Sequence, residues 1–121
     1  MENNTTTVPT VYDIPLLPAS ITRHIYLTEE FDTPSNYILT CQSILELEEY
    51  DQAEIHINSG GGNTSVSALL CNAMAKCKAP ITCILENEAH SAASVVFLNG
   101  DSFEVMKRYQ MLSSLSLYTL I

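Results

Sequence analysis

The chain has 121 residues, of which 46% are hydrophobic and 16% charged, a balance that is typical of one globular domain and excludes a disordered protein. Its 14 acidic residues against 5 lysines and arginines give a net charge of −9, and neither lysine nor arginine occurs between His24 and Ala75. Because a nucleic-acid surface needs clustered cations, we expect no nucleic-acid partner.

Neither export nor membrane insertion is indicated by the sequence. The start, Met-Glu-Asn-Asn-Thr-Thr-Thr, lacks the basic and apolar regions of a signal peptide, and no apolar run reaches the length of a membrane span. The four cysteines form no Cys-x-x-Cys pair. We therefore expect a reduced, cytoplasmic protein without a membrane segment.

The expected elements begin after a polar arm. Residues 1–20 are rich in threonine and broken by three prolines, and residues 21–121 are expected to form a single domain. A short strand is predicted at 24–27. Asp32-Thr33-Pro34 is a helix-start signal, and this helix is expected to end among the acidic residues 48–51, which oppose its dipole.

The next elements follow in regular alternation. Residues 53–58 alternate with period two, which predicts a strand. Asn63 or Thr64 is expected to cap a helix that Pro80 ends. The core-facing stripe of that helix repeats at three and four positions: Val66, Leu69, Leu70, Ala73, Met74 and Cys77.

Three further elements complete the pattern: an apolar strand at 81–85, a buried helix at 91–98 and a strand at 102–106. Such alternation predicts an α/β fold of βα units with a largely parallel sheet and right-handed crossovers. The tail at 106–121 is atypical, since it has neither a clear period nor a cap.

Two loops carry the functional signal. Three glycines, Gly60 to Gly62, follow the strand at 53–58 and allow backbone N–H groups to approach a bound group. Ser91 stands where the strand at 81–85 gives way to a helix. Both loops follow the carboxyl ends of strands, so glycine N–H groups and the N–H of Ala92 are expected near the serine hydroxyl. This combination suits acyl transfer, which needs a nucleophile and donors for an oxyanion.

In these motifs the chain resembles the proteolytic subunit of the ATP-dependent Clp protease, the ClpP family. The family has Ile-Asn-Ser-Pro-Gly-Gly where this chain has residues 57–62, and Gly-Gln-Ala-Ala-Ser-Met-Gly where it has residues 87–93. A Tyr-Asp-Ile segment before the first strand is also similar, at residues 12–14, so the resemblance covers roughly residues 12–106. The divergence suggests a remote or viral-type member with a ClpP/crotonase-like fold that is incomplete at the C-terminus.

The resemblance implies a serine endopeptidase subunit with Ser91 as nucleophile and Gly61, Gly62 and Ala92 as oxyanion donors. It implies a homo-oligomeric ring that receives unfolded proteins from an AAA+ unfoldase, which uses the ATP; the chain itself needs no cofactor. The arm at 1–20 is the natural place for gating and contact with that unfoldase.

Departures from the family pattern limit the expected activity. Gly60 replaces a proline, His90 replaces a small residue, and Ser113 stands where the family has its catalytic histidine after a Met-Ile pair. The family's aspartate lies beyond residue 121. Because a serine without a base is a poor nucleophile, we expect this chain alone to be inactive as a peptidase. Either the tail is unrelated to the family, as after a frameshift, or the chain is a degenerate subunit.

Alternative interpretations stay open for each feature. Without the resemblance Ser91 would be interpreted as a helix cap, and the alternative for the glycines is a mere tight turn. His90 is disfavoured as a substitute base, because neighbouring helical residues point about 100° apart. Histidines far apart in sequence predict no metal site. At the level of function, the alternatives are a non-catalytic scaffold subunit of the same fold and a crotonase-like acyl-thioester enzyme.

Overall fold

The structure is a computed structural model that describes residues 19–106. Four strands form one sheet: β1 (Thr22–Leu27), β2 (Gln52–Ser59), β3 (Ile81–Ala89) and β4 (Ser102–Val105). The strand order is β1-β2-β3-β4, and each neighbouring pair is parallel. The predicted α/β fold with a parallel sheet is therefore confirmed. Nearly all of the predicted arm at 1–20 and of the tail at 106–121 lies outside the described residues.

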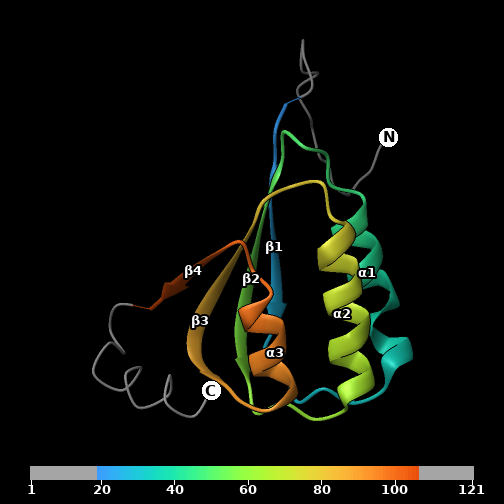
Figure 1. Ribbon diagram of the computed structural model, residues 1–121, viewed down its shortest axis with the longest axis vertical. Helices are drawn as coiled ribbons and strands as arrows, with labels where there is room; N and C mark the ends of the chain where they lie inside the picture. The colour runs from blue at the N-terminus through green and yellow to red at the C-terminus, as the bar shows by residue number, and fades with distance from the viewer. Residues whose placement is uncertain (1–18, 107–121) are drawn as a thin grey trace, which may run out of the picture.

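Helices connect the strands and cover one face of the sheet. They are a 3-10 turn (η2, Pro34–Tyr37), α1 (Ile38–Leu45), α2 (Thr64–Lys76) and α3 (Ala92–Leu98). In Figure 1 the helices gather on one side of the strands, and β4 lies at the edge of the sheet furthest from α1. Among the described residues, no helix has both the length and the apolar character needed to cross a bilayer.

The core lies between the sheet and the helices. The alternation of β2 places Ala53, Ile55 and Ile57 in this core, each at most 1% exposed. The apolar β3 adds Ile81, Cys83 and Leu85, and the helices cover these strands with mainly aliphatic side chains: Ile44, Val66, Leu70, Ala73, Met74, Val96 and Phe97. The opposite face of the sheet carries the polar members of the alternation.

Two helix predictions need correction. The helix that follows Pro34 ends at Leu45, before the acidic residues 48–51, because Asp51 closes a turn there. Its carboxylate accepts hydrogen bonds from the backbone N–H of Glu48 at 2.8 Å and of Ile21 at 2.9 Å. In α2, Asn63 is the cap, accepting from the N–H of Ser65 at 2.8 Å, but Leu69 is 38% exposed and lies at the margin of the predicted stripe.

Candidate functional site

The glycine loop after β2, residues 60–62, pairs through its backbone with Phe31. Gly61 and Gly62 have backbone φ values of 100° and 133°, which residues other than glycine rarely adopt. Phe31 donates its N–H to the Gly61 carbonyl at 2.7 Å and accepts from the N–H of Asn63 at 2.9 Å. These two bonds form a parallel bridge between Phe31 and Gly62, and they leave the N–H of Gly62 itself outside the pairing.

Ser91 occupies a strained turn between β3 and α3. Its φ of 53° and ψ of −125° make it the non-glycine residue with a positive φ in the described part of the chain. A helix cap normally has extended backbone, and Ser91 makes no capping hydrogen bond with its side chain. The interpretation of Ser91 as an ordinary cap is therefore wrong. Its conformation costs about 1–3 kcal/mol, a strain that is typical of active sites and of the nucleophile turn in hydrolases.

The two loops are in close contact, as the sequence predicted. A Cβ atom on Gly61 would lie 2.5 Å from the His90 carbonyl oxygen, 2.8 Å from the Ser91 Cβ and 3.1 Å from the Ala92 nitrogen. The N–H of His90 donates to the Ser59 carbonyl at 3.1 Å and ties the loops together. Only glycine at position 61 allows this approach, so a mere tight turn does not account for the glycine loop.

Not every predicted donor is available in this arrangement. The N–H of Gly61 donates to the Ser59 hydroxyl at 3.1 Å, so it is already engaged. Ala92 is the first residue of α3, where an N–H has no acceptor within the helix. Of the three predicted donors, Ala92 therefore remains next to Ser91 in the chain, and the N–H of Gly62 takes no part in the bridge with Phe31. Ser59, which the sequence did not single out, orders the loop.

Each of the three histidines contacts a carboxylate, and two of them also contact each other. His24 and His56 lie on the polar face of the sheet, with Nδ1 of His24 3.1 Å from Nε2 of His56. Nδ1 of His56 is 2.7 Å from Glu86, and Nε2 of His90 is 3.1 Å from Glu88. The expectation that separation in sequence keeps the histidines apart is wrong, because the parallel register of β1 and β2 brings two of them together.

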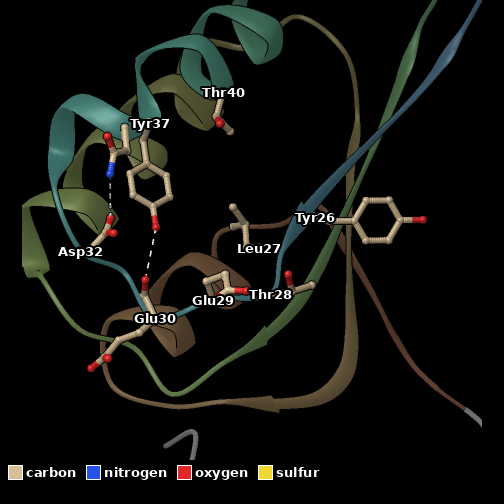
Figure 2. A pocket seen from close by; sticks show the side chains of 9 residues that line it. Tyr26, Leu27, Thr28, Glu29, Glu30, Asp32, Tyr37 and Thr40 are labelled. Atoms are coloured by element: carbon tan, nitrogen blue, oxygen red, sulfur yellow. Dashed lines mark hydrogen bonds between the residues drawn. The ribbon is translucent and has the colours of Figure 1, made fainter.

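An acidic hollow of about 520 Å³ lies between the end of β1 and the helical turn that follows it, and it was not predicted. Its lining comes from the end of β1, the segment after it, η2 and α1, and it includes the acidic residues Glu29, Glu30 and Asp32. Figure 2 shows the Tyr37 ring directed toward Glu30 and Tyr26 directed away from both. Burial, and next the charge of Asp32, raise the pKa of Tyr37. The adjacent acidic residues Glu29 and Glu30 were the available sequence signal for the charge of this hollow.

The family model described as Clp protease matches residues 13–116, which extends past Met106 into the tail. None of the curated proteins matches the chain in sequence.

Solved structures share the fold. The ClpP protease catalytic domain from Plasmodium falciparum is 22% identical, with a TM-score of 0.58, over 81% of this chain and 64% of that one. A ClpP1 variant from Listeria monocytogenes is 12% identical, with a TM-score of 0.59, over 81% of this chain and 66% of that one. The chain thus spans less than two thirds of the length of these two structures.

Proposed function

The chain belongs to the Clp protease family, and on that basis we propose that Ser91 is the nucleophile of a Clp-type serine endopeptidase subunit. The observation that carries this proposal is the positive φ of Ser91, at a turn against which Gly61 packs without room for a Cβ. A strained serine that does not cap its helix, beside a glycine loop, is what nucleophilic acyl transfer requires.

The proposed reaction begins with attack of the Ser91 hydroxyl oxygen on a peptide carbonyl carbon. The carbonyl oxygen then becomes an oxyanion, which the N–H groups of Gly62 and Ala92 stabilise by hydrogen bonds. Gly61 contributes mainly by allowing close approach, because its N–H would first have to leave the Ser59 hydroxyl. Donors of this kind typically contribute a factor of about 10²–10³ in rate each.

Attack by serine also needs a base to take its proton. Of the chain's three histidines, His24 and His56 are hydrogen-bonded to each other on the polar face of the sheet, and Nε2 of His90 contacts a carboxylate oxygen of Glu88. We propose that the 121 residues alone hydrolyse peptides negligibly, and that an active site needs a histidine from outside them. The same observation favours the second candidate function, a scaffold subunit that assembles with active ones.

The wider role follows from family membership and is part of the proposal. The substrates would be unfolded polypeptides, delivered to a ring of subunits by an AAA+ unfoldase that consumes the ATP. The chain itself would need no cofactor, and the location would be cytoplasmic. The family match favours this role over the crotonase-like alternative.

Labelling with a fluorophosphonate probe tests the nucleophile, with imidazole added in solution as a substitute base. The full chain is compared with Ser91→Ala and with Ser65→Ala, an exposed serine at the start of α2. We expect imidazole-dependent labelling on Ser91 that Ser91→Ala abolishes and Ser65→Ala leaves unchanged. Absence of labelling at Ser91 with imidazole present would refute the nucleophile and support the scaffold function.

A further inference from the structure

The polar face of the sheet carries a cluster of two histidines and two glutamates that the proposed peptidase does not use. His24 of β1 pairs in register with Glu54 of β2, and His56 follows on the same face of β2. Glu86 of β3 contacts His56 from the other side. The alternate residues Ile55 and Ile57 of β2 are buried under the helices, which lie on one side of the sheet in Figure 1, so the cluster lies on the other face.

Three ligand atoms of this cluster converge. Nδ1 of His24 and Nε2 of His56 are 3.1 Å apart, and Oε1 of Glu54 lies 3.3 Å from the first and 3.7 Å from the second. Zinc binds imidazole nitrogen and carboxylate oxygen at about 2.0–2.2 Å, so tetrahedral ligands are about 3.3 Å from one another. The three observed separations match the edges of such a tetrahedron.

The surroundings of His56 orient it as a metal ligand. Its Nδ1 is 2.7 Å from a carboxylate oxygen of Glu86. An ionised carboxylate only accepts hydrogen bonds, so Nδ1 carries the proton and the lone pair of Nε2 faces His24 and Glu54. The Tyr26 ring stacks on His56 at a centroid distance of 4.3 Å and fixes its plane. A carboxylate behind a ligating histidine is the usual arrangement in zinc sites.

We propose that His24, Glu54 and His56 form a binding site for a divalent transition-metal ion, zinc by its ligand chemistry, with Glu86 orienting His56. A single cation satisfies all three convergent atoms, whereas one proton joins only two of them. The His56 side chain is 11% exposed and that of His24 48%, so the fourth coordination position faces solvent. The ion would fasten β1 to β2, and through Glu86 to β3.

Ligand identity distinguishes this site from adventitious binding by the cysteines. X-ray absorption of the full chain loaded with one equivalent of zinc is expected to show nitrogen and oxygen ligands near ~2.0 Å; sulfur at ~2.3 Å would overturn the proposal. Long-range proton–nitrogen spectra are expected to show zinc on Nδ1 of His24 and on Nε2 of His56. Both measurements use the unmodified chain, so they do not depend on how a variant folds.

Calorimetric titration with zinc sulfate then tests each residue. We expect saturable binding of one ion, lost in His24→Ala and Glu54→Gln, and about 10–100-fold weaker in Glu86→Gln. His90→Ala is the matched control, because His90 also pairs with a glutamate but is not in the cluster. Magnesium, which prefers six oxygen ligands, is expected not to bind here. An unmodified chain without saturable binding, or equal affinities for His24→Ala and His90→Ala, would overturn the site.

Discussion

The substitution Gly61→Ala probes the contact between the two loops on which the proposed site depends. An added Cβ would lie 2.5 Å from the His90 carbonyl oxygen and 2.8 Å from the Ser91 Cβ, so the serine turn must move. Displacing a packed backbone costs about 1–3 kcal/mol. The φ of 100° adds about 1–2 kcal/mol for any residue with a Cβ. We expect a loss of about 2–5 kcal/mol in the free energy of unfolding.

Gly60→Ala provides the matched control in the same loop. A Cβ at Gly60 meets nothing within 4 Å, and its φ lies outside the left-handed region. We expect its effect to stay within about 1 kcal/mol, because the alanine also restricts the unfolded chain. Urea unfolding followed by far-ultraviolet circular dichroism measures both variants. Equal midpoints for the two variants would refute the contact between the glycine loop and Ser91.

Three further predictions follow from individual residues. Ser91→Gly is expected to raise the free energy of unfolding by about 1 kcal/mol while abolishing probe labelling, because glycine tolerates the positive φ at this turn; a less stable variant in urea unfolding would contradict the strain. Backbone N–H bonds from Glu48 and then Ile21 lower the pKa of Asp51, so its stabilisation is present above the unfolded pKa of about 3.9 and is lost as pH falls through the folded pKa. Asp51→Asn should therefore be less stable than the unmodified chain at pH ~6, with a difference that narrows at pH ~3; a constant difference in urea unfolding would contradict this. Burial, followed by the charges of Asp101 and Cys71, raises the pKa of the Cys83 thiol to about 12. Iodoacetamide at pH ~8 should thus label the other three cysteines first, and early labelling of Cys83 in a mass spectrum would contradict its burial.

Local periodicity was sufficient to predict most of the fold. The alternation from Ala53 to Asn58 identified β2, because each alternate side chain enters the core. The position of Asn63 after three glycines identified the start of α2. The end of α1 was missed because Asp51 accepts a hydrogen bond from the backbone N–H of Ile21, a residue remote in sequence, and helical propensity alone does not report such a contact.

The approach of the glycine loop to Ser91 could be predicted from the sequence, but its detailed geometry could not. The order of a glycine loop and a serine after successive strands indicated that Gly61 and Ser91 would meet, since parallel strands end at one edge of the sheet. The engagement of the Gly61 N–H by Ser59 depends on loop conformation and could not be read from residue types.

The contact between His24 and His56 could not be predicted from the sequence at all. His24 and His56 are 32 positions apart, and only the pairing of Tyr26 with His56 in the β1–β2 register places them together. Register in a parallel sheet is set by the packing of the whole core, so separation along the chain was a poor guide to separation in space.

Boron NMR of the full chain with a peptide boronic acid, with imidazole in solution to take the serine proton, tests the central claim that Ser91 is a nucleophile facing oxyanion donors. Addition of the Ser91 hydroxyl would convert trigonal boron to a tetrahedral adduct, whose oxygen the proposed donors Gly62 and Ala92 would bind. We predict a tetrahedral signal that is lost in Ser91→Ala and retained in Ser65→Ala. A signal that stays trigonal, or a tetrahedral signal that persists in Ser91→Ala, would contradict the claim.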